Sequence, residues 1–260
     1  TALGYQNVLK INHLALKLHL AIFALLSAIC IQIGTNFIND ALDFIKGADT
    51  KERIGPKRIS QSGAVPAKKV LLAGFFALVL SALFGFPLVQ AAGAPILILG
   101  LLSLICAYIY TGGPFPIAYT GLGEIFVILF FGFGAVLGTF FLQASLINMN
   151  SLILSSQIGL LAAVIIAINN LRDYETDRIA QKWTLAARFG PVFGKYLLHV
   201  FYFIFFALSF YWLMHDQAYL FYCSLAVLPF CVFILYSIHK NKPSQKYNKY
   251  LGLSAFSELV

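Results

Sequence analysis

Two short stretches of this sequence place amide and carboxylate side chains at helical spacing, where long apolar runs end. The spacing is four and then three residues in the first stretch and four residues throughout in the second. The two sets are Asn36, Asp40 and Asp43, and Asn169, Asp173 and Asp177. Side chains three or four residues apart lie on one face of a helix. Each stretch therefore predicts a helix end with several oxygen atoms on one side.

Carboxylates at the edge of an apolar run need a partner. A charged side chain at the centre of a membrane helix costs about 2.5–3.5 kcal/mol on insertion scales, and clustered carboxylates also repel one another. Mg²⁺ would relieve both effects, because it prefers oxygen ligands and is commonly shared between carboxylates and substrate phosphates. We therefore expect a Mg²⁺ site with catalytic carboxylates and nearby amides. The carboxylates are Asp40, Asp43, Asp173 and Asp177, and the amides are Asn36, Asn169 and Asn170.

Basic side chains accompany both acidic stretches. Arg binds phosphate oxygens with a planar fork and Lys binds them as a point charge, so we expect these residues to bind a diphosphate group. They are Lys46, Arg53, Lys57, Arg58, Arg172, Arg178 and Lys182. A single Asp-x-x-x-Asp motif usually marks a solvated helix end, and a basic loop can simply reflect membrane topology. Two such motifs on the same side of a membrane favour a binding site.

Two further polar residues are candidates for the substrate pocket. Tyr110 stands directly before a glycine-rich loop, and Glu124 begins the next apolar segment. Each also has a simpler explanation. Tyrosine is a common anchor at the membrane interface, and an acid in the first turn of a helix interacts favourably with the helix dipole. Both explanations stay open at this point.

The composition is that of a membrane protein. Of the 260 residues, 60% are hydrophobic and 11% are charged, whereas soluble proteins average about 25% charged residues. We predict an all-α, polytopic helical bundle that forms a single domain over residues 1–260. Seven apolar segments are near the ~20 residues that a bilayer requires. Their approximate limits are 14–38, 70–90, 94–110, 124–143, 151–171, 192–213 and 219–239, and residues 250–260 resemble the start of another.

The distribution of Lys and Arg predicts the orientation. Sixteen of the 18 lie in segments 46–69, 172–195 and 240–249, which follow the first, fifth and seventh predicted spans. Positively charged loops stay in the cytoplasm, so both acidic stretches are expected to face it, most simply in a bacterial cytoplasmic membrane. The same argument explains the net charge of +8 without nucleic acid. The four cysteines form no Cys-x-x-Cys pair, which speaks against a zinc site or a disulfide framework.

Four segments together resemble the UbiA superfamily of intramembrane aromatic prenyltransferases. They are the stretch from Asn36 to Asp49, the run Arg-Ile-Gly-Pro-Lys-Arg at 53–58, the stretch Tyr-Thr-Gly-Gly-Pro-Phe-Pro-Ile-Ala-Tyr at 110–119 with Gly-Glu at 123–124, and the stretch from Asn169 to Leu185. The similarity is greatest to the branch of this superfamily that prenylates 1,4-dihydroxy-2-naphthoate in menaquinone biosynthesis.

The resemblance implies a nine-helix bundle with a central cavity, Mg²⁺ bound by both acidic motifs, a polyprenyl diphosphate donor and a bicyclic aromatic acceptor. It also implies loss of the acceptor carboxylate as CO₂, which gives demethylmenaquinol. The four aspartates match the metal-binding acids of the superfamily and Asn36 matches the Asn that opens the first motif. Three basic positions match those associated with the diphosphate: Arg53, Arg58 and Lys182.

The departure from the superfamily pattern is at the ends of the chain. Seven spans are visible where the family fold has nine, so we expect the first and last helices of that fold to lie outside this chain. Another acceptor, such as 4-hydroxybenzoate or homogentisate, would fit the same chemistry. A membrane transporter is the alternative of a different class, because intramembrane acids also line ion and substrate pathways. The prenyl chain length and the oligomeric state are not indicated by the sequence.

Overall fold

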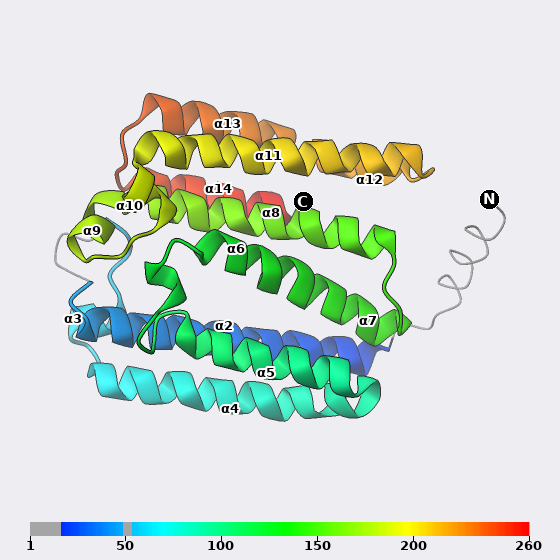
Figure 1. The fold of residues 1–260 in the computed structure, drawn as a ribbon, viewed down its shortest axis with the longest axis horizontal. Coiled ribbons are helices and arrows are strands. Elements are labelled where there is room, and N and C mark those ends of the chain that lie inside the picture. Colours follow the sequence, from blue (N-terminus) through cyan, green and yellow to red (C-terminus); the bar gives the residue numbers. More distant parts are fainter. Residues whose placement is uncertain (1–16, 49–53, 260) are drawn as a thin grey trace.

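The computed structural model describes residues 17–48 and 54–259, and all regular structure in these two ranges is helical. The long helices run side by side as one bundle (Figure 1). The elements are α2 (Leu18–Ile45), α3 (Ile59–Ser62), α4 (Ala67–Ala92), α5 (Ala94–Ile109), the 3₁₀-helix η1 (Ile117–Tyr119), α6 (Gly123–Val127), the π-helical η2 (Ile128–Leu137), α7 (Gly138–Ala144), α8 (Met149–Arg172), α9 (Tyr174–Ile179), α10 (Leu185–Phe189), α11 (Pro191–Met214), α12 (Ala218–Leu225), α13 (Leu228–Lys240) and α14 (Tyr247–Leu259).

The predicted spans correspond to these helices. Six segments in the described part of the chain are long and apolar enough to cross a membrane: 18–45, 67–92, 123–144, 149–172, 191–214 and 218–240. The remaining predicted span, 94–110, corresponds to α5, which has 16 residues and is shorter than the six segments above. The expectation of an all-α membrane bundle is confirmed. Residues 250–260, expected to begin another span, fall largely within α14.

The bundle has two halves with one segmented helix between them. Figure 1 shows α2, α4 and α5 on one side, α8, α11, α13 and α14 on the other, and the continuous run of α6, η2 and α7 between them. The second half is built around α8, whose buried face contributes Val164, Ile168 and Leu171 to a core shared with α11, α13 and α14. Large apolar side chains such as Leu72 and Phe203 are exposed on the outside, as expected for helices that face lipid.

Glycine allows the central segment to approach α8 closely. A Cβ atom added at Gly132 would clash with the backbone carbonyl of Ser155, and one at Gly159 would lie 2.9 Å from the carbonyl oxygen of Ile128. Close backbone packing through small residues is a common way for helices to associate within a membrane. This contact fixes the position of the central segment relative to α8, and therefore the position of Glu124 at its beginning.

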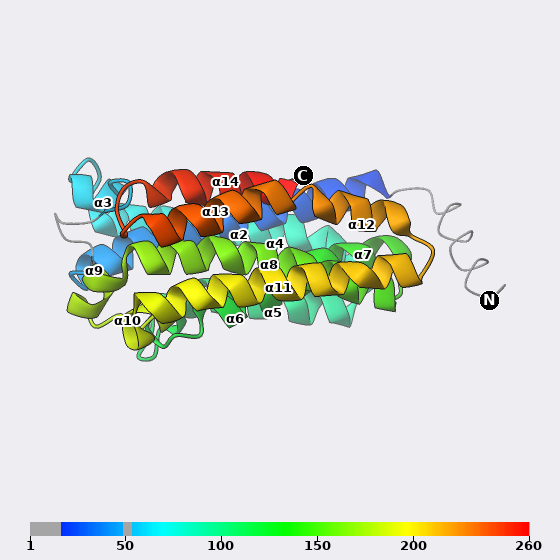
Figure 2. The same ribbon diagram turned by 90° about the horizontal axis from the view of Figure 1, so that it is seen from above.

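The polar connections gather at one end of the bundle. Two views at right angles show α3, α9, α10 and the turn between α13 and α14 at this end, while α7 and α12 lie at the other (Figures 1 and 2). The described parts of the three basic segments identified in the sequence belong to this group. Both acidic stretches therefore lie at the same end of the molecule, where α2 and α8 finish.

Candidate active site

The first acidic stretch lies within the last three turns of α2, and its aspartates are buried. Asp40 is 7% exposed and Asp43 is 2% exposed. Both carboxylate oxygens of Asp40 accept hydrogen bonds from backbone amides at the start of α3, that of Ile59 at 2.9 Å and that of Ser60 at 3.0 Å. Asp40 thus holds the segment that follows the loop against α2.

Asp43 connects three separate parts of the chain. Its Oδ2 accepts a hydrogen bond from Arg58 at 2.9 Å, and its Oδ1 accepts one from the phenol of Tyr119 at 2.8 Å. The ammonium of Lys46 lies 4.9 Å from the centre of the Tyr119 ring, and that of Lys182 lies 5.9 Å from it. Tyr119 therefore brings the first acidic stretch into contact with a basic residue that follows the second.

The second acidic stretch is divided between the end of α8 and the short helix α9. Arg172, 2% exposed, donates from Nε to Oδ1 of Asp173 at 2.8 Å and also pairs with Oδ2 of Asp173. Its other donors bind Asn169 at 2.8 Å and Asn248 of α14 at 2.6 Å. A buried guanidinium with this many charge-assisted bonds is well fixed. Arg172 thus orients Asp173 and ties α14 to the end of α8.

Asp177 makes longer polar contacts than the other three aspartates of the two acidic stretches. Its Oδ1 lies 3.9 Å from the ammonium of Lys182, and its Oδ2 accepts a hydrogen bond of 3.4 Å from Thr184. Burial raises the pKa of Asp177 to about 6; Lys182 opposes this, and the negative charges of Asp173 and Asp43 reinforce it. The two acidic stretches are therefore close enough to repel each other electrostatically.

A cavity of about 880 Å³ extends from this polar end into the bundle. The polar end is lined by Asn36, Asn39, Arg58, Asn169, Lys182 and Thr184. The other end reaches Leu88, Ile96 and Leu142, three members of one buried apolar cluster. Along α5 the lining runs from Ile96 to Tyr110, which at 1.5 Å per residue is about 21 Å. The cavity therefore joins a charged end to a long apolar one.

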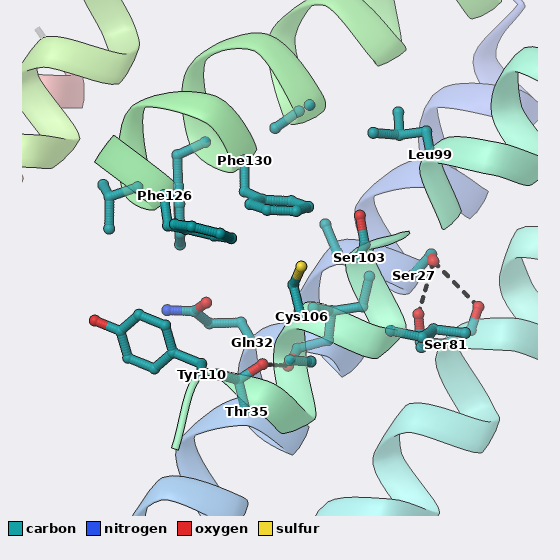
Figure 3. A pocket seen from close by; sticks show the side chains of 18 of the residues that line it. Ser27, Gln32, Thr35, Ser81, Leu99, Ser103, Cys106, Tyr110, Phe126 and Phe130 are labelled. Carbon is teal, nitrogen blue, oxygen red and sulfur yellow. Dashed lines mark hydrogen bonds between the residues drawn. The ribbon is translucent and has the colours of Figure 1, made fainter. Parts of the chain in front are cut away.

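Figure 3 shows the side chains in the middle of this cavity. The rings of Phe126 and Phe130 lie across the space from Tyr110 and Gln32. These two phenylalanine rings are stacked, with centroids 5.9 Å apart and planes 18° from parallel. Ser27 and Ser81 bond to each other farther along. The middle of the cavity therefore offers flat apolar surfaces with polar groups opposite.

The chemical type of the oxygen atoms at this end suits a hard cation. Carboxylates and amides are the oxygen ligands that Mg²⁺ prefers. Burial is the main cause of the raised pKa of Asp177, and the negative charges of Asp173 and Asp43 that add to it are ones that a cation would neutralise. As arranged, however, no three acidic, His or Cys side chains within the described residues are grouped closely enough to hold a metal ion. Asp40, Asp43 and Asp173 are engaged by the groups described above. A bound cation would have to share or replace those partners.

The structure brings seven of the predicted residues to the cavity, whereas the four aspartates, Lys46 and Arg172 are not among its lining residues. The seven are Asn36, Arg58, Tyr110, Glu124, Asn169, Asn170 and Lys182. Lys57 is exposed and outside this lining, and Arg178 is also exposed and donates to the carbonyl of Ala187. Lys46 bonds to the carbonyl of Thr111 beside Tyr119. Arg53 lies outside the described residues.

Sequence reasoning did not select two residues that complete the polar end. Tyr119 donates to Asp43, and Thr184 donates to Asp177 and caps α10 by accepting from the amide of Ala187. Tyr119 is the last residue of the stretch at 110–119 that resembles the family, and this position was a weak indication of a role in the site. Thr184 shows the Ser/Thr preference of helix N-caps, but nothing local connects it with Asp177.

Comparison with known proteins identifies the family. The model of the UbiA prenyltransferase family matches residues 11–257. This chain belongs to the UbiA prenyltransferase family. Two curated relatives of this UbiA-family chain are called 1,4-dihydroxy-2-naphthoate octaprenyltransferase. That of Haemophilus influenzae is 40% identical over 212 residues, 75% of this chain and 64% of the relative. That of Escherichia coli is 40% identical over 178 residues, 66% of this chain and 58% of the relative.

The matches span about three fifths of the length of these curated relatives. A solved structure of a UbiA homologue from Archaeoglobus fulgidus, bound to DMAPP and Mg²⁺, has the same fold with a TM-score of 0.70. It is 18% identical in sequence, and the match covers 94% of this chain and 87% of that one. The UbiA family is thus shown by sequence, and the helical membrane fold is shown by structure.

Proposed function

We propose that this UbiA-family protein catalyses Mg²⁺-dependent transfer of a polyprenyl group from polyprenyl diphosphate to 1,4-dihydroxy-2-naphthoate. Loss of the acceptor carboxylate as CO₂ would give demethylmenaquinol, so the reaction would belong to menaquinone biosynthesis. The observation that carries the proposal is the cavity with one charged and one long apolar end. A polyprenyl diphosphate has the same division between its two ends, and the names of the curated relatives supply the acceptor.

The charged end of the cavity suits the leaving group. Arg58 and Lys182 line it and would contact the outer oxygens of the diphosphate. Mg²⁺ at the aspartates would neutralise charge on the diphosphate as the allylic C–O bond breaks. Arg172 keeps the carboxylate of Asp173 in position, and Tyr119 does the same for Asp43. Carboxylates held in this way would keep a bound cation in position to stabilise the developing anion, together with the basic side chains.

The apolar part of the cavity suits the prenyl chain and its reactive cation. Its walls carry Leu88, Ile96 and Leu142 at the far end and the rings of Phe126 and Phe130 nearer the charged end. An apolar wall keeps water away from an allylic cation, so the ring of the acceptor is the available nucleophile. The basic loops at this end favour a cytoplasmic orientation of the site in a bacterial membrane.

The test is prenyl transfer by the full-length protein in membrane vesicles, with 1,4-dihydroxy-2-naphthoate, ¹⁴C-labelled in its carboxylate, and an unlabelled polyprenyl diphosphate. We expect a prenylated quinol, release of labelled CO₂, and loss of both on addition of EDTA with recovery on excess Mg²⁺. Transfer to 4-hydroxybenzoate or homogentisate alone would replace the acceptor in this proposal. Absence of transfer to any aromatic acceptor would reject the enzyme and favour a test of transport.

A further inference from the structure

Glu124 is a buried acid with an unused oxygen atom in the wall of the cavity. Its side chain is 2% exposed, and its Oε1 accepts a hydrogen bond of 2.9 Å from the amide of Asn170. Its Oε2 is buried and has no hydrogen-bond partner among the residues that the structure describes. A buried acceptor without a partner lowers the stability of the fold, because it has lost its hydrogen bonds to water. Such an atom therefore needs either a structural reason or a ligand.

A second polar group lies near the start of α6, where Glu124 stands. Tyr110 also lines the cavity, and its phenol is so close to the backbone before Glu124 that a Cβ atom at Gly123 would lie 3.4 Å from its oxygen. Opposite Tyr110 lie the stacked rings of Phe126 and Phe130 (Figure 3). A flat aromatic molecule between these surfaces would have apolar faces on one side and hydrogen-bonding groups on the other.

The charges around Glu124 determine which group of a bound aromatic molecule can lie next to it. A carboxylate next to Glu124 would be repelled, whereas Arg58 and Lys182 line the cavity at its charged end. A hydroxyl group, by contrast, can donate a hydrogen bond to a free carboxylate oxygen, and this type of bond is stronger than one between neutral groups. Glu124 therefore selects a hydroxyl group rather than an anion.

Resting on the proposed function, we propose that Glu124 is the specificity-determining residue for the aromatic acceptor. Its Oε2 accepts a hydrogen bond from the 4-hydroxyl group of 1,4-dihydroxy-2-naphthoate. Asn170 fixes the orientation of the Glu124 carboxyl group, and the ring of the acceptor packs against Phe126 and Phe130. The acceptor carboxylate points toward Arg58 and Lys182. The site is thus divided into a hydroxyl-recognising part at Glu124 and an anion-binding part at the basic residues Arg58 and Lys182.

The test compares two acceptors that differ by one hydroxyl group, 1,4-dihydroxy-2-naphthoate and 1-hydroxy-2-naphthoate. The kcat/KM for the dihydroxy acceptor is divided by that for the monohydroxy acceptor. This ratio is measured for the wild-type protein, Glu124→Gln and Glu124→Met, with farnesyl diphosphate as the common donor. The control is Glu175→Gln, because Glu175 is an exposed acid on α9 outside the cavity lining. A site built to bind a hydroxyl group rejects an analogue that lacks it.

We expect Glu124→Met to lower this ratio by about 10- to 100-fold, as for loss of a hydrogen bond to a charged group. Glu124→Gln keeps an acceptor oxygen and should lie between Met and wild type. The KM for farnesyl diphosphate should change less than twofold in all variants, and Glu175→Gln should match wild type. A ratio that is unchanged in both Glu124 variants would overturn the proposal, as would an equal rise in KM for donor and acceptor.

A binding measurement keeps this result separate from the proposed function. The shift in Tm produced by each naphthoate is recorded without donor for the wild type and the Gln variant. A larger shift with the dihydroxy compound, reduced in Glu124→Gln, supports the hydroxyl site even if wild-type protein transfers no prenyl group. Equal shifts with both compounds in the wild type reject the site, whatever the outcome of the transfer assay.

Discussion

Replacing Asp177 by Asn should stabilise the metal-free protein at neutral pH. Burial, reinforced by Asp173 and Asp43, raises the pKa of Asp177 from 3.8 to about 6 in the folded state. Because the folded state holds this proton more tightly than the unfolded state, the stability of the fold decreases as pH rises from about 4 to 6 and stays low above that range. Asn has a similar shape and carries no charge, so it removes this cost.

The size of the effect follows from the two pKa values. Each pKa unit corresponds to about 1.4 kcal/mol, so a change from 3.8 to about 6 represents about 3 kcal/mol at pH 8. By the same relation about half of this remains at pH 5. In soluble proteins of similar size 1 kcal/mol corresponds to about 2–4 °C in Tm, so we expect an increase of several degrees.

The assay is thermal unfolding of detergent-solubilised protein in EDTA at pH 8 and pH 5. Asp177→Asn should have a higher Tm than wild type at pH 8 and a smaller advantage at pH 5. Glu175→Gln is the matched control, since Glu175 is exposed on the same helix, and its Tm should equal that of wild type at both pH values. A lower Tm for Asp177→Asn at pH 8, or an advantage that does not depend on pH, would refute the argument.

Two other substitutions test the supports of the site. Gly132→Ala should lower the Tm markedly, because its Cβ would clash with the carbonyl of Ser155 and overpacking costs about 1–3 kcal/mol or more. Gly252→Ala is the control and should not lower the Tm, because nothing lies within 4 Å of the added Cβ. Asn248→Ala removes the 2.6 Å bond that Arg172 makes to α14, so the Mg²⁺ concentration needed for half-maximal transfer should rise several-fold. An unchanged Mg²⁺ requirement would show that α14 does not position the guanidinium.

Local patterns in the sequence were sufficient to predict the long helices and the end of α8, whereas the first span was predicted to end near residue 38 and α2 continues to Ile45. Apolar runs of about 20 residues and side chains at intervals of three and four residues are properties of neighbouring positions. This is why Asp43 and Asp177 could be assigned to one end of the bundle. The splitting of the last predicted span into α12 and α13 was not foreseen, although Pro229 at the start of α13 is a local signal for it.

The contacts that complete the site depend on distant residues. Tyr119 is 76 positions from the Asp43 that it binds, and Asn248 is 76 positions from Arg172. Only the packing of the helices brings such pairs together, so no spacing in one sequence predicts them. The role of Arg172 changes for the same reason: its donors were expected to bind diphosphate, and the structure directs them to Asp173, Asn169 and Asn248.

The hydrogen bonds that Asp40 accepts from α3 would report whether its carboxylate binds a cation. Its two oxygens hold the amides of Ile59 and Ser60, and those hydrogens exchange with solvent slowly only while the bonds last. A cation that withdrew either oxygen would free one amide and loosen the start of α3. Faster deuterium uptake at these two positions would then record occupancy of the acidic end, with no substrate or turnover required.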